Sequence, residues 1–395
     1  MNRNSSPLRR AVLAAAVACV LGTTACSSTG ADATGSTAGG SSAGGTAPAA
    51  ATAAVQAAVK GIDGPVPTTG PSAVQGRNVW IVSAFEQVPN IAVMTKSLKE
   101  AGQALGWKVS VCDGRNNAGG AWAACVRQAV AAKASGIILD AVDCAPVKAA
   151  LAEARSAGTK IVGMSAFDCS DPRQGGGASM FDGNATFVST VPSTAEFLRQ
   201  QGRLRADWII AQSKGRAKVV HVRFRGVALG EYLAEGFTEE IATCKGCSVV
   251  GTVDITPEDI PQIRQKFESA LLKAPQADAV AVDEDFIVTA GIQQALATAN
   301  RPGLIAAGGE CSQDTLSALR TGRGVQMCIG SSLGRLAYSA ADALNRVFAG
   351  AQPAPSGLGW SLVTKDDNLP AEGALFESST DYRAGYRAVW GASAS

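Results

Sequence analysis

The sequence is almost devoid of histidine, with the single residue His221 among 395. A serine–histidine–aspartate hydrolase would have to use His221, yet this residue interrupts the apolar segment KVVHVRF, which predicts a buried strand. We therefore expect His221 to be a packed, hydrogen-bonded residue. Of the functions considered for this chain, an exported hydrolase is the one that the sequence favours least. The chain has no GxGxxG and no phosphate loop, because GGGASMFDG at 175–183 lacks the Lys-Ser/Thr of such a loop. We therefore predict no enzyme and no cofactor.

An excess of charge of one sign is also absent. There are 35 Lys and Arg against 33 Asp and Glu, for a net charge of +2. Removal of three arginines with an N-terminal leader gives +2 − 3 = −1, which offers no electrostatic attraction for nucleic acid. After that leader, no apolar run reaches the eighteen or so residues that a membrane span needs.

The N-terminus has the pattern of an export signal. Arg3, Arg9 and Arg10 precede the apolar segment from Ala11 to Leu21, and small residues then lead to Cys26. This resembles a bacterial lipoprotein signal over residues 1–25, with Cys26 acylated after cleavage. Thr23 departs from that pattern, in which an aliphatic residue is usual, so an ordinary secreted protein is the alternative.

Residues 26–76 are rich in Ser, Thr, Gly and Ala, with too little apolar bulk to offset the entropy of ordering. We expect a flexible tether, interrupted by a short Ala-rich helix from Ala50 to Lys60. The folded body is expected to begin near Arg77, and its length of roughly 320 residues suggests two domains.

From residue 77 onward, short apolar runs alternate with amphipathic stretches of helical period. NVWIVSA, WKVSVCD, SGIILDA and KIVGMSA are strand-like in the first half, and KVVHVRF, SVVGTVDI, DAVAVDE and GLIAAGG are strand-like in the second. Such alternation is typical of βαβ units. The predicted fold class is therefore α/β, with two doubly wound parallel-sheet lobes and a cleft at the carboxyl ends of the strands.

The segments GWKVSVCDGRNN, SGIILDAVDCAPVKAALAEARSAGTKIVGM, YLAEGFTEEI and ADAVAVDEDFIVTAGIQQAL resemble, in order and pattern, the ribose-type periplasmic sugar-binding proteins. The resemblance covers nearly all of residues 77–391 and implies a type I periplasmic binding protein with a three-segment hinge. The implied crossings fall near 186–192, 329–332 and 359–362. The first lobe is then 77–188 with 331–360, and the second is 189–330 with 361–395.

The function implied by this resemblance is the capture of a small polar ligand and its delivery to an ABC permease. The protein is expected outside the cytoplasm, as a monomer that a lipid on Cys26 anchors to the outer face of the membrane. A sensory receptor that signals to a membrane kinase is the alternative, because the chain would look the same in either role.

The resemblance places the ligand at loops that follow the strands. The implied contacts in the first lobe are Phe85, Glu86, Asn90, Ser165, Phe167 and Asp168. In the second lobe and at the hinge they are Arg225, Glu231, Tyr232, Asp283, Asp285, Glu310 and Ser331. Glu231, Asp283 and Glu310 could instead be helix N-terminal acids that the helix dipole favours.

Departures from the family pattern bear on the ligand. Ser165 and Ala166 stand where pentose binders carry Asp-Arg, and Glu231 stands where they carry Arg. Ribose is therefore disfavoured. Several carboxylates around one ligand repel each other unless the ligand brings donors or positive charge. We predict a sugar, a polyol or an amine-bearing ligand, rejection of anionic sugars, and weaker binding after Glu231→Gln or Glu310→Gln.

Eight of the ten cysteines remain after Cys19 is removed with the leader and Cys26 is acylated, and an exported protein pairs such residues. Strands that end near Asp143 and Asp168 would lie side by side, so their following cysteines would meet; Asp143 is expected to cap a helix starting at Ala145. The CxxC at 244–247 has no second CxxC, so a structural turn is expected and no metal. The predicted disulfides are Cys112–Cys125, Cys144–Cys169, Cys244–Cys247 and Cys311–Cys328.

Overall fold

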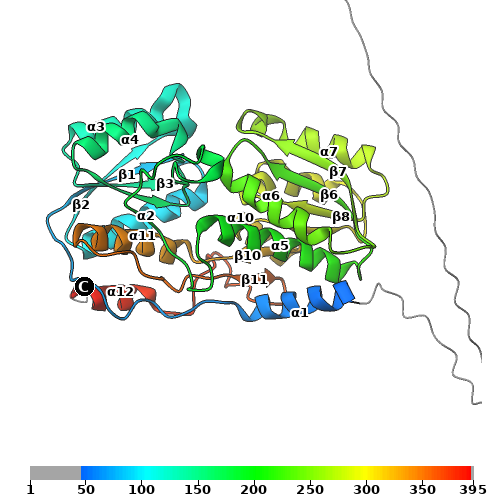
Figure 1. Ribbon diagram of the computed structural model, residues 1–395. Helices are drawn as coiled ribbons and strands as arrows, with labels where there is room; N and C mark the ends of the chain where they lie inside the picture. The colour runs from blue at the N-terminus through cyan, green and yellow to red at the C-terminus, as the bar shows by residue number, and fades with distance from the viewer. Residues whose placement is uncertain (1–45, 393–395) are drawn as a thin grey trace, which may run out of the picture. The chain divides into compact units, whose positions relative to one another are not determined.

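Two β-sheets organise the computed structural model, which describes residues 46–392 (Figure 1). The first sheet has the strand order β2-β1-β3-β4-β5, and all of its strand pairs are parallel. Its strands are β1 (Asn78–Ser83), β2 (Lys108–Asp113), β3 (Gly136–Asp140), β4 (Lys160–Met164) and β5 (Gly183–Asn184). The central strand β3, with the sequence GIILD, is buried at every residue, as expected of a strand covered on both faces.

Helices cover both faces of the first sheet. On one face, α2 (Pro89–Ala104) and α11 (Leu333–Phe348) pack against β1 and β4. On the other lie α3 (Ala121–Ala131) and α4 (Lys148–Ser156). A Cβ at Gly136 would come within 3.0 Å of Leu344, so glycine lets α11 lie close to β3. This sheet and these helices form the first lobe.

The second sheet has the order β11-β10-β9-β8-β6-β7, and only the pairing of β10 with β11 is antiparallel. Its strands are β6 (Lys218–Phe224), β7 (Ser248–Ile255), β8 (Ala279–Val282), β9 (Ile305–Gly308), β10 (Met327–Gly330) and β11 (Ser361–Thr364). The prediction of two parallel-sheet α/β lobes is confirmed. Strand β11 is antiparallel because the chain enters the second sheet again from the first lobe, where α11 lies.

Helices also cover both faces of the second sheet. Buried side chains of α5 (Thr194–Gln212) and α6 (Ala228–Ile241) pack on one face, and those of α7 (Ile263–Lys273) pack on the other. The helices α9 (Gln293–Thr298) and α10 (Gln313–Thr321) follow β8 and β9. A Cβ at Gly236 would lie 2.0 Å from the carbonyl oxygen of Arg199, so α5 and α6 can approach closely only with glycine there. These elements form the second lobe.

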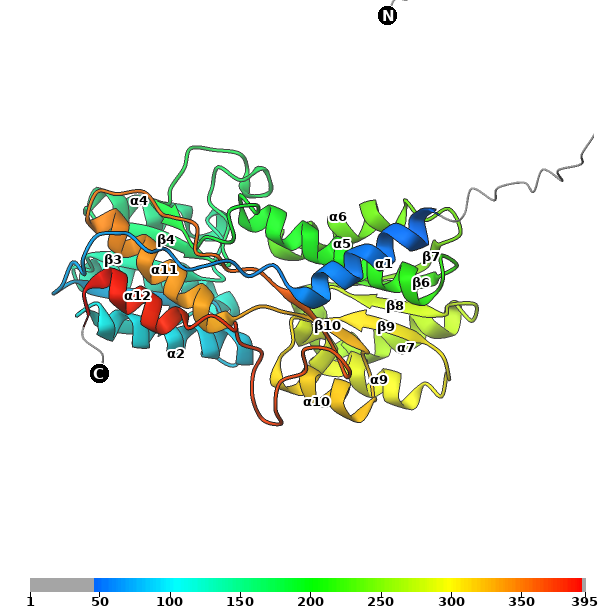
Figure 2. The same ribbon diagram turned by 90° about the horizontal axis from the view of Figure 1, so that it is seen from below.

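The folded body begins earlier than we predicted. Helix α1 spans Thr46–Lys60 and packs against α5 and β11 of the second lobe (Figure 2). Residues 61–76, called here the N-terminal strap, then run to the first lobe, where Ala73 N donates to Trp390 O at 2.9 Å. The expectation of a tether as far as residue 76 is therefore wrong for 46–76, because backbone groups of the strap bond to the body. The leader, Cys26 and residues 26–45 lie outside the described residues.

The C-terminal helix also departs from the expected lobe boundaries. Helix α12 (Tyr382–Trp390) packs against α11, and Tyr338 stacks on Trp390 with ring centroids 5.7 Å apart. Residues 382–390 thus lie on the first lobe, although β11 belongs to the second sheet as expected. Besides the three expected crossings, two further segments pass between the lobes. They are residues 365–381 and the segment that leads from α1 into the strap. In residues 46–392, no helix combines the length and apolar character that a membrane span requires.

All four predicted disulfides are present. The Cα atoms are 5.6 Å apart in Cys112–Cys125, 5.1 Å in Cys144–Cys169, and 5.3 Å in both Cys244–Cys247 and Cys311–Cys328. Cys144 and Cys169 follow the neighbouring parallel strands β3 and β4, which is the reason that the sheet order could predict this pair. The bridge holds the loop after β4 against the segment after β3.

Replacing Cys144 and Cys169 together by serine should lower the free energy of unfolding by about 3 kcal/mol, because the bridge closes a loop of 25 residues. The matched control, Cys244→Ser with Cys247→Ser, opens a loop of only 3 residues and should cost about half as much. Urea denaturation under oxidising conditions measures both. Equal losses in the two double variants would contradict the loop-length argument.

Candidate functional site

Polar side chains collect where the parallel strands of each lobe end. In the first lobe, Asp140 ends β3 and is fully buried. The Thr95 hydroxyl of α2 lies 2.7 Å from Glu86 Oε1 and 3.3 Å from Asp140 Oδ2. Burial, with Glu86 nearby, raises the pKa of Asp140 well above its usual range. Asp140 Oδ1 has no hydrogen-bond partner in the described residues, so this strand end keeps an unused buried acceptor.

Four consecutive or neighbouring acids gather at the ends of β8 and β9 in the second lobe. Asp283 is fully buried and its Oδ1 lies 2.8 Å from His221 Nε2. Asp285 Oδ1 and Oδ2 accept from the backbone N–H of Glu310 and Ser312, both at 3.1 Å. Glu284, between them, has a pKa raised well above its usual range by burial and by Glu310.

Arg205 of α5 is the cation within this acidic group. Its Nη2 donates to Glu310 Oε1 at 3.0 Å, while Glu310 Oε2 accepts from Asp285 N at 2.9 Å. Burial nevertheless raises the pKa of Glu310 to about 7. Arg205 is fully buried, and its Nε and Nη1 have no partner among the described residues. One buried guanidinium therefore pairs with Glu310 and keeps two donors that no described residue uses.

A separate set of contacts joins the two lobes directly; we call it the interlobe clasp. It comprises Asp171 and Arg173 of the first lobe and Tyr232 and Glu235 on α6. The Tyr232 hydroxyl donates to the Asp171 carboxylate at 2.7 Å, and Arg173 Nη2 donates to Glu235 Oε2 at 2.7 Å. The Arg173 guanidinium also lies 4.7 Å from the centroid of the Tyr232 ring. The clasp holds the lobes together at this side of the strand ends.

Several predicted ligand contacts belong to the clasp or support it. Phe167 packs on Tyr232 with ring centroids 5.2 Å apart. Glu231 accepts hydrogen bonds from Arg225 and from Gly226 N, and lies 3.8 Å from Arg173. The charge of Glu231 is thus compensated within the clasp. Glu310 also has a cationic partner, but it lines the hollow between the lobes, and this makes it the better position at which to test ligand binding.

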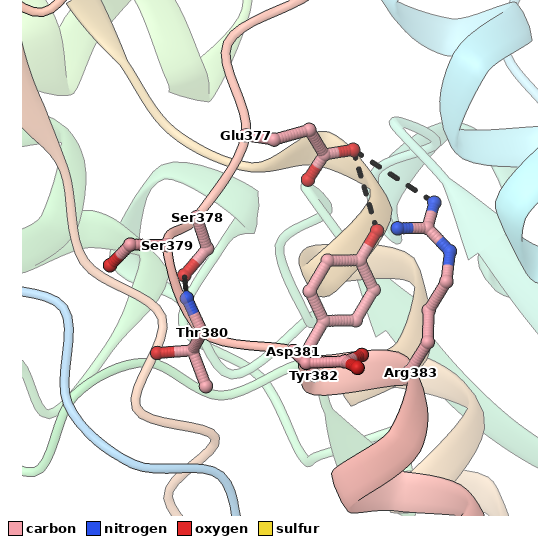
Figure 3. Close-up of a pocket in the computed structure, with 7 residues that line it drawn as sticks. All are labelled: Glu377, Ser378, Ser379, Thr380, Asp381, Tyr382 and Arg383. Carbon is pink, nitrogen blue, oxygen red and sulfur yellow. Dashed lines mark hydrogen bonds and ion pairs between the residues drawn. The ribbon is translucent and has the colours of Figure 1, made fainter.

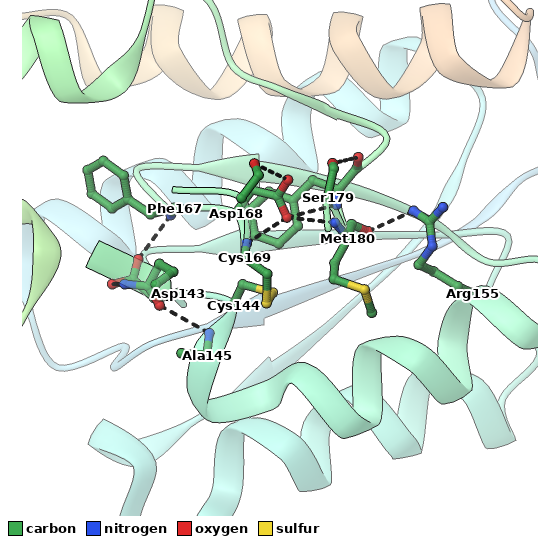
Figure 4. Close-up of a disulfide and its surroundings, with 12 residues drawn as sticks. Asp143, Cys144, Ala145, Arg155, Phe167, Asp168, Cys169, Ser179 and Met180 are labelled. Atoms are coloured by element: carbon green, nitrogen blue, oxygen red, sulfur yellow. Dashed lines mark hydrogen bonds between the residues drawn. A yellow bond between two sulfur atoms is a disulfide. The ribbon is translucent and has the colours of Figure 1, made fainter. Parts of the chain in front are cut away.

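Asp168 holds its own loop (Figure 4). Its Oδ1 accepts from Cys169 N and Met180 N, both at 2.7 Å, and its Oδ2 accepts from Ser170 Oγ at 2.9 Å. These hydrogen bonds lower the pKa of Asp168 in spite of the opposing effect of burial. The carboxylate that we placed in contact with the ligand is therefore engaged in shaping the loop after β4.

The predicted capping role of Asp143 is wrong. Ala145 N donates to Gln174 Oε1 at 3.1 Å, while Asp143 accepts from Phe167 N at 3.0 Å and from Gln174 Nε2 at 2.9 Å. Gln174 takes the cap because the disulfide brings the loop after β4 over the helix start. Burial, together with Asp171, raises the pKa of Asp143 to about 7 against these hydrogen bonds.

The other predicted contacts lie near the strand ends without meeting in one set. Phe85 and Asn90 are half-buried in and after the loop that follows β1. Ser165 follows β4 with a left-handed φ of 50°. Ser331 Oγ donates to Gly359 O at 2.8 Å, within the hinge.

Two hollows are found near these elements. One, of about 10 Å³, is lined by residues of both lobes and the hinge, including Val93, Glu310, Ser331 and Phe376, and has room for about one water. The other, of about 270 Å³, is lined by the single segment Glu377–Arg383 and includes none of the predicted contacts (Figure 3). Within residues 46–392, no cluster of His, Cys, Asp or Glu is arranged to hold a metal ion.

Four residues of the strand-end clusters were missed by the sequence reasoning: Thr95, Asp140, Arg205 and Glu284. The clasp residues Asp171, Arg173 and Glu235 were missed as well. Asp140 was missed because we placed the end of β3 three residues late, at Asp143. Glu284 stands between two acids that we selected, and the sequence does not show which of three consecutive acids points toward Glu310. Arg205 lies in the interior of α5, away from any strand-end loop, so no signal of that kind could find it.

The fold and these clusters can now be compared with known proteins. A family model described as a periplasmic binding protein domain matches residues 79–352. The chain belongs to the periplasmic binding protein family. Its members bind solutes outside the cytoplasm and are not enzymes, which agrees with the prediction from the sequence. No curated protein sequence matches the chain.

Solved periplasmic binding proteins share the fold at low sequence identity. An ABC transporter solute-binding protein from Burkholderia graminis C4D1M, in complex with D-arabinose, has a TM-score of 0.62 and 18% identity, covering 76% of this chain and 99% of its own. One from Actinobacillus succinogenes 130z, with bound D-allose, has a TM-score of 0.61 and 16% identity, covering 73% and 98%. One from Mycobacterium smegmatis, with bound glycerol, has a TM-score of 0.59 and 17% identity, covering 77% and 99%.

Asp143 should make stability depend on pH. Because its folded-state pKa is about 7 and its ordinary value is 3.8, the folded protein holds this proton between roughly pH 4 and 7, and stability falls as pH rises through that window. Between pH 5 and pH 8, the free energy of unfolding should fall less in Asp143→Asn than in the wild type, by on the order of 1 kcal/mol.

Chemical denaturation at the two pH values measures this effect. Asp366→Asn, on an exposed loop after β11, is the matched control and should leave the pH dependence unchanged. Glu310, whose pKa is also about 7, is present in the wild type and in both variants, so part of the pH dependence of stability remains in all three. An unchanged slope in Asp143→Asn would contradict the assignment.

Proposed function

We propose that this chain is a membrane-tethered solute-binding protein that captures a sugar, a polyol or an amine-bearing ligand between its lobes and delivers it to an ABC importer. The observation that carries the ligand class is the charge balance at the strand ends. Glu86 and Asp140 stand on one lobe, and Asp283, Glu284 and Glu310 stand on the other, with Arg205 as the cation bonded to Glu310.

Carboxyl groups in this arrangement suit a ligand that donates hydrogen bonds. Hydroxyl or ammonium groups can donate to a carboxyl group that lines the hollow between the lobes, such as that of Glu310, whereas a ligand carboxylate or phosphate would add repulsion. Arg205 holds the Glu310 carboxyl group in place from behind, through the hydrogen bond between Nη2 and Oε1. The hinge segments allow the lobes to close on it, and the interlobe clasp stabilises the closed arrangement.

Glu310→Gln should weaken binding, more for a cationic ligand than for a neutral one, because a charge-assisted hydrogen bond is lost. A thermal-shift panel of D-arabinose, D-allose, glycerol, glucosamine and glucuronate tests this. A ligand at 100 times its Kd should stabilise the protein by about 2.7 kcal/mol, and glucuronate should give no stabilisation.

Asp314→Asn, in the exposed first turn of α10, is the matched control and should bind as the wild type does. Calorimetry then gives the affinity of any sugar or amine that stabilises the protein. Tight binding of glucuronate that Glu310→Gln leaves unaffected would overturn the proposed ligand class.

The membrane tether is tested at Cys26, which lies outside the described residues. If Cys26 is acylated, Cys26→Ala should release the protein from the membrane fraction or leave the leader uncut. Cys19→Ala is the matched control, because Cys19 lies in the leader and is removed with it. Detergent-phase partitioning and the mass of the mature chain provide the readout. Normal processing with unchanged membrane association in Cys26→Ala would exclude the lipid anchor.

A further inference from the structure

Residues 46–76 lie outside the part of the chain that the family model matches. The family model begins at residue 79, and the solved structures are matched over 98–99% of their own length while covering only 73–77% of this chain. These residues nevertheless bond to both lobes. They therefore add a connection between the lobes outside the region that the family model covers.

Helix α1 fixes one end of this segment to the second lobe. Ala51 and Ala58 are buried in the core that α5 shares, with exposed fractions of 2% and 5%. Val59 O accepts from Asn368 Nδ2 at 2.7 Å, just after β11. Pro48 packs at Gly215, where a Cβ would come within 2.7 Å of its ring. The helix thus moves with the second lobe.

The next residues pair with the backbone of the crossing between α11 and β11. Ile62 N donates to Trp360 O at 3.0 Å, and Gly64 N donates to Gly357 O at 2.8 Å. Asp63 Oδ1 accepts from Gly359 N at 2.7 Å, so side chain and backbone both bond to this crossing. The beginning of the strap is therefore held along a hinge segment.

The remainder of the strap is fixed to the first lobe by buried polar side chains of α11. Arg335 Nη2 donates to Gly64 O at 2.6 Å, and Arg346 Nη2 donates to Thr69 O at 2.7 Å. Asn345 Oδ1 accepts from Val74 N at 2.9 Å. Arg335 and Asn345 are fully buried. If the strap detached, each would lose a hydrogen-bond partner that water does not readily replace. Both views show the segment between α1 and β1 passing α11 and α12 (Figures 1 and 2).

We propose that the N-terminal strap limits how far the two lobes open and thereby slows ligand exchange. Opening of a binding protein rotates one lobe about the hinge segments. Here the rotation must also carry a covalent segment that is anchored on both lobes and hydrogen-bonded to a hinge segment between them. Pro65, Pro67 and Pro71 fix φ at three of its positions, so the strap has few backbone dihedrals with which to follow the motion.

The direct test is to cut the strap in the full-length, oxidised protein. A specific protease sequence inserted after Lys60, an exposed residue at the end of α1, allows cleavage without removing any residue. The same insertion after Gly158, in an exposed turn between α4 and β4, is the matched control. Small-angle X-ray scattering of the ligand-free protein should give a larger radius of gyration after cleavage at 60 and no change after cleavage at 158.

Asp63→Ala provides a second test that leaves the chain intact. It removes the acceptor of Gly359 N and of Ser378 Oγ, and should speed amide exchange at Gly359 roughly tenfold and increase the radius of gyration. Asp381→Ala, which removes a cap of α12 without contacting the strap, is its control. Unchanged scattering in both the cut protein and Asp63→Ala would overturn the proposal. No ligand is needed, so failure here is distinguishable from failure of the proposed function.

Discussion

One fully buried guanidinium, that of Arg335, ties together the segments that pass between the lobes. Its Nη2 donates to Gly64 O in the strap and to Ser356 O in the crossing to β11, and its Nη1 donates to Ser378 Oγ in the passage to α12. Asp63 Oδ2 lies 3.5 Å from Arg335 Nη1. A buried cation requires such partners, so these three segments are held at α11 together. Loss of any one would leave a donor of Arg335 unpaired.

The charges at the strand ends follow a different rule from the charges at the hinge. At the hinge and in the clasp, each cation meets carboxylates or carbonyl oxygens, as Arg173 does with Glu235 and Arg346 does with Asp342 at 2.6 Å. At the ends of β3 and β8, Asp140 and Asp283 are buried with one unused oxygen each, and burial raises the pKa of Asp140 and of Glu284. The hinge and the clasp thus pair their charges, whereas some carboxyl oxygens at the strand ends keep no partner among the described residues.

Local patterns in the sequence predicted the fold and the disulfides well. Apolar strands such as GIILD alternate with amphipathic helices, and the order of parallel strands then brings Cys144 to Cys169. The strap was beyond such reasoning because its partners are hundreds of residues distant, as Arg346 is from Thr69, and because residues 46–76 have the composition of a tether. Helix α12 was placed on the wrong lobe because its amphipathic pattern does not show that it packs on α11. The site was predicted only by its location. Family positions led to Glu310 and Tyr232, but not to the pairing of Tyr232 with Asp171 or to Arg205 in the middle of a helix.

The strap also sets the order in which the native structure can be completed. The strap bonds to Arg335, Asn345 and Trp390. Its bonds to the side chains of Arg335 and Asn345 join residues that are 271 positions apart in the sequence. Both lobes can form their parallel sheets from nearer segments, yet the strap has no binding surface until α11 and α12 exist. Contacts of such long sequence separation form late and slowly. The strap therefore docks only after α11 and α12 have formed, and its native packing reports that these two helices have folded.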